Sequence, residues 1–194
     1  MNNVVFENEI TVEVDAPYES LKDILRFKGF NLVEEYDLID VYMLRNDNAE
    51  TEPLSILKNC VLIRNIITKD KEIKKITYKY KEYNDKKEII KQGKVECGIE
   101  DEMEAQKLLE VMGYHQLIKI VDHSKIFSNG VTELAVQLVN DKHIYIELEE
   151  NGQTLNTVED LKREINSYGI PFKSDNYFVK KAEIELLECA EKNA

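Results

Sequence analysis

The stretch Tyr145-Ile146-Glu147-Leu148-Glu149 alternates charged with apolar side chains, and the fold can be inferred from this pattern. A β-strand sends successive side chains to opposite faces, so the two glutamates share one face and the apolar residues between them share the other. Comparable alternation recurs at Glu7-Asn8-Glu9-Ile10-Thr11, Val61-Leu62-Ile63-Arg64, Thr77-Tyr78-Lys79-Tyr80-Lys81 and Lys94-Val95-Glu96. On an open sheet the charged face would be solvated, whereas in a closed barrel it would line a polar tunnel.

Composition limits the class of protein. At 194 residues, the chain is expected to form a single domain over residues 1–194 with a substantial core. Its net charge of −12 disfavours general attraction to nucleic acid or to an anionic membrane, so neither partner is expected. The three cysteines lack CxxC spacing, and no stretch approaches the roughly 20 apolar residues that cross a bilayer. The start of the chain does not read as a signal peptide, so we expect a cytoplasmic location.

Helical and strand-like segments divide the chain in an α+β pattern. We expect helices over 17–28, 101–113 and 157–168, and a last helix that starts at Ser174 or Asp175 and ends near Lys192. Strands are expected near 4–15, 31–45, 59–68, 73–83, 86–97, 116–127, 131–140 and 142–150, with a helical turn or loop over 54–59. The fold class is therefore α+β, with antiparallel strands and helices packed outside them. The family resemblance described below implies in addition that about eight strands close into an antiparallel β-barrel.

A strand, a helix and a glycine followed by an aromatic residue occur twice. The first copy contains Leu25 and ends at Gly29-Phe30, and the second contains Leu109 and ends at Gly113-Tyr114. This similarity indicates an internal duplication of a strand–helix–strand unit. Two such antiparallel halves could join at their edges to close a barrel.

These charged strands, in this order, resemble the CYTH superfamily of triphosphate tunnel metalloenzymes, which includes class IV adenylate cyclases, thiamine triphosphatases and inorganic triphosphatases. The resemblance spans roughly residues 5 to 190 in the family's order. The matching segments are Glu7-Asn8-Glu9, Asp40-Val41-Tyr42, Val61-Leu62-Ile63-Arg64, Thr77-Tyr78-Lys79 and Tyr145-Ile146-Glu147-Leu148-Glu149.

The resemblance implies a ligand with a triphosphate group, such as ATP, thiamine triphosphate or tripolyphosphate, bound with Mg²⁺ or Mn²⁺ inside the barrel. Phosphate oxygens need Arg or Lys donors in a fixed array, and divalent metals take carboxylate oxygens. The candidate triphosphate-binding residues are Arg64, Lys79, Lys81 and Lys94. The candidate metal ligands are Glu7, Glu9, Glu147 and Glu149. No catalytic residue is assigned.

The sequence departs from the family pattern mainly at its cations. Thr11 stands where the family has lysine and Leu62 where it has arginine; Asp122 and Ser124 fall on a Lys-x-Arg pair, Gln92 on an arginine and Gln137 on an aspartate. Each lost charge-assisted contact is worth roughly 1.5–3 kcal/mol, so the affinity for a triphosphate would fall by orders of magnitude. A two-residue shift of the alignment would make Lys119 or Lys125 substitutes.

Two functions therefore stay open. The first is a CYTH-like protein that binds a triphosphate ligand with metal and hydrolyses or cyclises it. The second is a catalytically inactive CYTH-like barrel, plugged by residues such as Leu62, that serves as an anion-binding or protein-interaction module. The sequence leaves open whether the chain is an enzyme, which organic group its ligand carries, and its oligomeric state, although the resemblance implies a homodimer.

Plainer interpretations exist for the same residues. The glutamates of the charged strands could form a solvated face, and Arg64 and Lys79 could extend their charged ends to solvent without binding an anion. The histidines, His115, His123 and His143, lack the spacing of metal ligands and are expected on the surface or in turns.

Overall fold

The computed structural model describes residues 5–6, 8–83 and 89–192, with side chains described for residues 8–79 and 93–191. These residues contain five helices and nine strands, so the α+β class is confirmed. The chain divides into two compact units. Unit 1 comprises Met1–Phe6, Asp37–Val121 and Lys180–Ala194, and unit 2 comprises Glu7–Tyr36 and Asp122–Val179.

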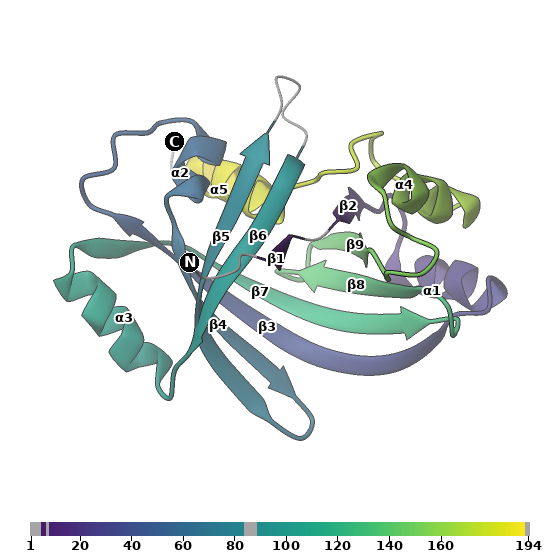
Figure 1. The fold of residues 1–194 in the computed structure, drawn as a ribbon, viewed down its shortest axis with the longest axis horizontal. Helices are drawn as coiled ribbons and strands as arrows, with labels where there is room; N and C mark the ends of the chain where they lie inside the picture. Colours follow the sequence, from purple (N-terminus) through teal and green to yellow (C-terminus); the bar gives the residue numbers. More distant parts are fainter. Residues whose placement is uncertain (1–4, 7, 84–88, 193–194) are drawn as a thin grey trace. The chain divides into compact units, whose positions relative to one another are not determined.

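The described strands form one sheet with the order β1-β6-β5-β4-β3-β7-β8-β9-β2 (Figure 1). The long strands β3 (Asn31–Arg45) and β7 (Tyr114–Ser128) each run from one unit into the other. The ladders whose register is described are antiparallel. The order ends at β1 and β2 without closing among the described strands, so the antiparallel sheet is confirmed and the closed barrel is not.

Unit 1 contains the ladders of β1 (Val5–Phe6), β6 (Ile89–Gly98), β5 (Glu72–Tyr83) and β4 (Val61–Thr68). Its helices are α2 (Pro53–Lys58), α3 (Glu102–Val111) and α5 (Lys181–Lys192), and α2 contacts α5. On one face, Met43 and Ile63 form a buried cluster with Ala105 and Leu109 of α3. Because side chains alternate along a strand, the residues on either side of Ile63, Leu62 and Arg64, belong to the other face.

Unit 2 contains β8 (Glu133–Val139), β9 (His143–Glu149) and β2 (Glu9–Glu13), with α1 (Tyr18–Phe27) and α4 (Val158–Ser167). The apolar positions of β2 and β9 are almost fully buried: Ile10, Val12, Ile146 and Leu148 are each 1% exposed. Helix α4 contacts both strands and buries Leu161 and Ile165. The charged residues that alternate with these positions therefore form a separate, polar face.

Glycines end the two helices that the sequence repeat predicts. Helix α1 is followed by Gly29 with a φ of +85°, and α3 is followed by Gly113 with a φ of +88°. This left-handed conformation suits glycine and terminates a helix. Each glycine leads into one of the long strands, β3 or β7, so the repeated strand–helix–strand pattern is present in the structure.

The last helix begins later than its sequence indicates. Helix α5 starts at Lys181, not at Ser174 or Asp175. The segment before it runs along the edge of β2, where the Thr11 amide donates to the Tyr177 carbonyl at 3.0 Å and the Val179 amide donates to the Thr11 carbonyl at 3.0 Å. Hydrogen bonding to an open strand edge competes with helix formation here, and this competition depends on residues far away in the sequence.

None of the described helices is long and apolar enough to cross a membrane. No disulfide joins the three cysteines, all of which lie in the described part of the chain.

Thr157→Ala is expected to lower the free energy of unfolding by about 1 kcal/mol. The Thr157 hydroxyl accepts a hydrogen bond from the Asp160 amide at 3.2 Å and donates to the Asp160 carboxylate at 2.8 Å, so Thr157 caps the start of α4. Urea unfolding of the variant measures the loss. Thr157→Ser keeps the hydroxyl and is the matched control, so an equal loss in both variants would contradict capping as the cause.

Candidate functional site

Three glutamates of unit 2, Glu9, Glu147 and Glu149, form an acidic cluster on the polar face of β2 and β9. In the antiparallel ladder, Glu9 lies directly opposite Glu149, and Thr11 lies opposite Glu147. Each glutamate offers a carboxylate oxygen, and these oxygens lie within 4.8 Å of one another. Like charges directly opposite each other destabilise a ladder, and a divalent cation bound by their oxygens would offset this repulsion.

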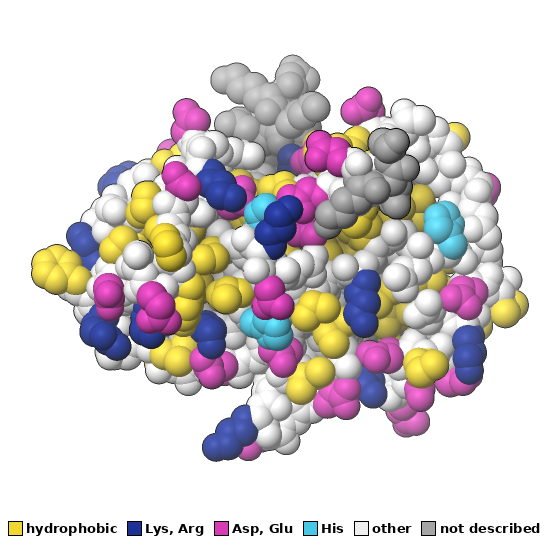
Figure 2. All heavy atoms as spheres, turned by 180° about the vertical axis from the view of Figure 1, so that it is seen from behind, with side chains coloured by type: hydrophobic (Ala, Val, Ile, Leu, Met, Phe, Trp, Pro, Cys, Tyr) yellow, Lys and Arg dark blue, Asp and Glu magenta, His cyan; other side chains and the backbone are white. Residues whose placement is uncertain are grey.

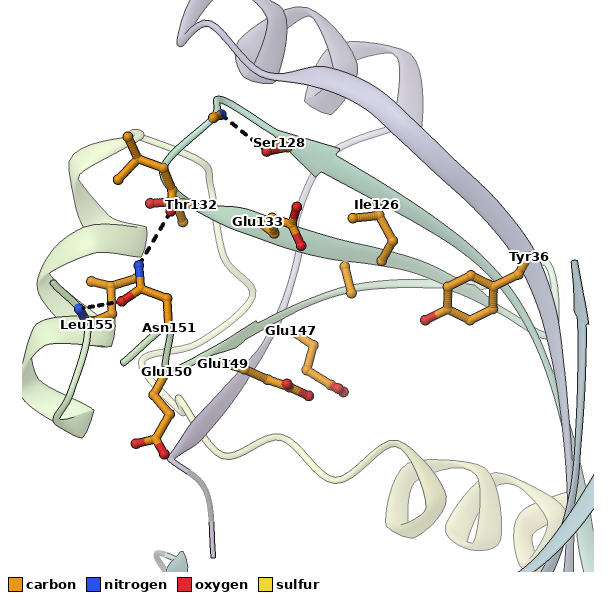
Figure 3. A pocket seen from close by; sticks show the side chains of 13 residues that line it. Tyr36, Ile126, Ser128, Thr132, Glu133, Glu147, Glu149, Glu150, Asn151 and Leu155 are labelled. Atoms are coloured by element: carbon orange, nitrogen blue, oxygen red, sulfur yellow. Dashed lines mark hydrogen bonds between the residues drawn. The ribbon is translucent and has the colours of Figure 1, made fainter. Parts of the chain in front are cut away.

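A cavity of about 470 Å³ lies beside the acidic cluster within unit 2 (Figure 3). Glu147 and Glu149 lie side by side in it, and Tyr36 and Glu133 from other strands also line it. Its lining residues include four glutamates, and none of those described is Lys, Arg or His. An anion would therefore be repelled from this cavity unless a cation entered with it.

Two loops at the rim of the cavity are held by local hydrogen bonds. The Asn151 side-chain oxygen accepts from the Leu155 amide at 3.0 Å, and its amide nitrogen donates to the Val131 carbonyl at 3.4 Å (Figure 3). In the neighbouring turn, the Gly130 amide donates to the Ser128 hydroxyl at 3.1 Å. The rim is therefore held by hydrogen bonds between Asn and Ser side chains and the backbone of the turns.

The structure places four of the departures from the family pattern, Thr11, Asp122, Ser124 and Gln137, on the same face as the acidic cluster. Ser124 pairs with Gln137, and Gln137 pairs with Tyr145, so both share the face of Glu147. Ser124 donates to the Asp122 carboxylate at 2.9 Å, and each of these two residues is 1% exposed. At Asp122 and Ser124, an acidic and a neutral group therefore occupy positions at which the resemblance implies cations.

Lys125 does not substitute for those cations. It pairs with Val136, which places it on the opposite face of β7 from Ser124. Its ammonium group forms an ion pair with Glu35 and lies 5.9 Å from the centre of the Tyr18 ring, on helix α1. The alternating geometry of the strand therefore rules out this substitute.

The candidate cations lie in unit 1, on the face of β4, β5 and β6 that carries Leu62. On β5, Lys79 lies opposite Lys94 of β6, and Thr77, two residues before Lys79, lies opposite Leu62 of β4. Residues two apart on a strand share a face, so Lys79 and Lys94 lie on the face of Leu62 and Arg64. Arg64 and Lys79 are partly buried and Lys94 is exposed. We call Arg64, Lys79 and Lys94 the basic cluster.

The side chains of two predicted site residues, Lys81 and Glu7, lie outside the described set. The backbone of Lys81 lies opposite Gln92 in the β5–β6 ladder, but its side chain lies outside the described set. Glu7, the fourth predicted metal ligand, lies outside the described residues.

Arg64 is engaged by a residue to which the sequence assigned no site role. Its Nε donates to Oδ1 of Asp40 at 2.7 Å and its Nη2 donates to Oδ2 at 2.6 Å, with the side chains only 15% and 8% exposed. Burial alone would raise the pKa of Asp40, but the hydrogen bonds and charge of Arg64, with the charges of Lys79 and Lys181, outweigh burial and lower that pKa. Asp40 is therefore a carboxylate anion at neutral pH.

His143 is buried, which contradicts its expected place on the surface or in a turn. It is 8% exposed, and its Nδ1 lies 2.8 Å from Oε1 of Glu13. The same oxygen accepts from Nζ of Lys173 at 2.6 Å, and the Lys173 backbone amide donates to the Glu13 carbonyl at 3.0 Å. The segment that runs along β2 thus brings Lys173 to Glu13, the partner of His143. The spacing of the histidines in the sequence carries no information about these contacts.

Among the described residues, the face of the molecule seen in Figure 2 carries no uniform basic patch. Acidic and basic side chains are interspersed there with hydrophobic ones. Together with the net charge of −12, this distribution means that anion binding would depend on particular clusters and not on a general surface potential.

Comparison with known proteins establishes the fold. No protein-family model and no curated protein sequence matches the chain. A protein from Pyrococcus horikoshii OT3 superposes with a TM-score of 0.69 at 17% identity, over 93% of this chain and 99% of that one. A candidate adenylate cyclase from Vibrio parahaemolyticus superposes with a TM-score of 0.64 at 14% identity, over 96% of this chain and 99% of that one.

A candidate adenylyl cyclase from Hippeastrum, described as having a dominant triphosphatase activity, superposes with a TM-score of 0.62 at 14% identity. That superposition covers 94% of this chain and 96% of the plant chain. Identities this low show a shared fold and do not transfer an activity. The chain therefore shares its fold with the Pyrococcus protein and with these two candidate cyclases.

Proposed function

We propose that the chain binds a triphosphate-containing ligand together with Mg²⁺ or Mn²⁺, inside a closed antiparallel barrel, and hydrolyses a phosphoanhydride bond of that ligand. The acidic cluster carries this proposal, because it brings together carboxylates from β2 and β9, two strands that are far apart in the sequence. An all-oxygen donor set is the kind that Mg²⁺ and Mn²⁺ prefer, so the residues present fit such an ion. When bound, the metal supplies positive charge for phosphate oxygens.

The proposal gives each cluster one role. Glu9, Glu147 and Glu149 hold the metal, with Glu7 as a further ligand. Phosphate oxygens are bound by the basic cluster and by Lys81. Water as the attacking group gives hydrolysis, and a ribose hydroxyl gives cyclisation; the scarcity of cations on the polar face of unit 2 favours hydrolysis of a ligand such as ATP, thiamine triphosphate or tripolyphosphate. A cytoplasmic location and a homodimer belong to the same proposal.

Tripolyphosphate binding is expected to require the metal. Without a cation, the four glutamates of the cavity repel a polyphosphate, whereas with excess Mn²⁺ this repulsion is offset. Isothermal titration calorimetry with and without Mn²⁺ measures the difference, and heat that continues after saturation indicates hydrolysis. Binding of equal strength without any divalent metal would contradict the proposal.

Substitutions in each cluster sharpen this test. Glu147→Gln is expected to abolish metal-dependent binding, and Glu159→Gln, on the exposed side of α4, is the matched control. Lys79→Ala is expected to weaken tripolyphosphate binding about tenfold or more, as the loss of one charge-assisted contact does. Its control is Lys69→Ala, which is exposed beyond the end of β4.

A catalytically inactive barrel that serves as an anion-binding or protein-interaction module is the second candidate. It is supported by Leu62, which is 2% exposed and shares the face of Arg64, where the resemblance implies an arginine. For this candidate, no binding heat is expected with tripolyphosphate at millimolar concentration. Glu147→Ala would then leave thermal stability in the presence of Mn²⁺ unchanged.

A further inference from the structure

We propose that Asp40 is a specificity-determining residue of the basic cluster: its carboxylate occupies the edge of the Arg64 guanidinium that a phosphate group would take. Asp40 thereby lowers the affinity of the site for polyphosphates. This inference rests on the proposed function, since it concerns the same anion site. In it, the Asp40 carboxylate competes with the ligand's phosphate for Arg64.

The geometry of the pair is the first argument. Nε and Nη2 of Arg64 each donate to a different oxygen of Asp40, at 2.7 and 2.6 Å. Two parallel hydrogen bonds of this kind are the arrangement in which a guanidinium also binds phosphate. A phosphate that approached the same edge would have to displace the carboxylate, and one that approached elsewhere would still meet its negative charge.

The pair of Asp40 and Arg64 is also buried. The side chains of Asp40 and Arg64 are 8% and 15% exposed, so little solvent screens the charge of Asp40 from an anion bound beside Arg64. Lys79 and Lys181 also act on this carboxylate and lower its pKa, so it stays ionised at neutral pH. Part of the positive charge of the basic cluster thus stabilises the Asp40 carboxylate.

A second acid on the same face acts in the same direction. Glu96 lies opposite Thr77, and its carboxylate forms an ion pair with Lys75 at 2.8 Å. These side chains are 29% and 19% exposed, so this pair is less buried than the pair of Asp40 and Arg64. Of these two acids, Asp40 is therefore the one whose removal is expected to change anion binding more.

The alternative role for Asp40 is to position Arg64 for a phosphate, and the two roles predict opposite signs. The direction of β4 already sends Arg64 to the face that carries Leu62, so the strand itself sets the side from which the guanidinium leaves. What Asp40 adds is a negative charge at the hydrogen-bonding edge. A positioning residue would strengthen polyphosphate binding, whereas a competitor weakens it.

The test is calorimetric titration of tripolyphosphate, with excess Mn²⁺, into wild type and Asp40→Asn. Asparagine keeps the size of the side chain and removes the charge. We expect the dissociation constant for tripolyphosphate to fall at least tenfold while the dissociation constant for Mn²⁺ alone stays unchanged. Asp47→Asn is the matched control, because Asp47 forms the same two-bond pair with Arg45 but on an exposed surface, at 2.9 and 2.7 Å.

The outcomes separate this inference from the proposed function. If wild type binds and Asp40→Asn binds equally or more weakly, Asp40 is not a competitor and only the inference is overturned. If wild type fails to bind and Asp40→Asn binds, the inference stands and the proposed native function fails. If neither protein binds, both are overturned.

A measurement on wild type keeps the inference testable even if Asp40→Asn does not fold. The chain has four arginines, and three of them, Arg26, Arg45 and Arg163, are exposed. In NMR spectra, the Nε–H signals of these three can be assigned by replacing each with lysine. The remaining Nε–H signal then belongs to Arg64. We expect the Arg64 Nε–H resonance to shift when tripolyphosphate displaces Asp40. Saturable binding that leaves this resonance unchanged would overturn the inference.

Discussion

Replacing Arg64 with alanine is expected to destabilise the chain by about 3–5 kcal/mol, because the substitution leaves a buried carboxylate without its partner. The Asp40 side chain is 8% exposed, and both of its oxygens accept hydrogen bonds from Arg64. In the variant, the ionised carboxylate keeps its cost of desolvation and loses its strongest compensation. Urea unfolding at pH 7, followed by circular dichroism, measures the change in the free energy of unfolding.

The pH dependence of this effect has a definite sign. In wild type the folded-state pKa of Asp40 is below its ordinary value of 3.8, so the stabilisation is present above that value and is lost as the pH falls through the lower folded-state pKa. In Arg64→Ala, burial dominates and raises the pKa of Asp40, so protonation relieves the buried charge. The difference in stability between the two proteins is therefore expected to shrink from pH 7 towards pH 4.

Arg45→Ala is the matched control for this prediction. Arg45 pairs with Asp47 in the same two-bond geometry, but the side chains are 58% and 69% exposed. Exposed pairs contribute little because water already solvates both charges. A comparable loss of stability in both variants would show that burial of the Asp40 pair is not the cause.

Replacing both Glu147 and Glu149 with glutamine is expected to stabilise the metal-free protein and to abolish its stabilisation by Mn²⁺. Glu149 lies directly opposite Glu9, and like charges in such a pair cost roughly 0.2–1 kcal/mol. In wild type, a ligand present at a hundred times its dissociation constant adds about 2.7 kcal/mol to stability. The sign of the substitution therefore reverses between metal-free and metal-saturated conditions.

Thermal unfolding in chelator and in a series of Mn²⁺ concentrations measures both effects. Glu159→Gln, which removes a glutamate on α4 of the same unit, is expected to respond to Mn²⁺ like wild type. If the double variant gains as much stability from Mn²⁺ as wild type does, the ion binds elsewhere and the acidic cluster is not the metal site.

Local patterns in the sequence were sufficient to predict most elements of the fold. The alternation in Tyr145-Ile146-Glu147-Leu148-Glu149 gives both the strand and the face to which each glutamate belongs, because both follow from the backbone of the strand itself. The capping box at Thr157 and the left-handed Gly29 and Gly113 are similarly local, since each depends on residues within one helical turn.

Only the tertiary structure decided which residues meet. The register of β2 against β9 places Glu9 opposite Glu149, and packing of β3 near β4 allows Asp40 to take the guanidinium of Arg64. The contact of Lys173 with Glu13 also depends on tertiary structure, because the segment that carries Lys173 pairs with β2. Helix α5 begins only after this segment, at Lys181. Alternation and capping depend on neighbours along the chain, so the sequence by itself determined them. Register and ion pairing depend on segments that are distant in the sequence, so only the folded structure determined them.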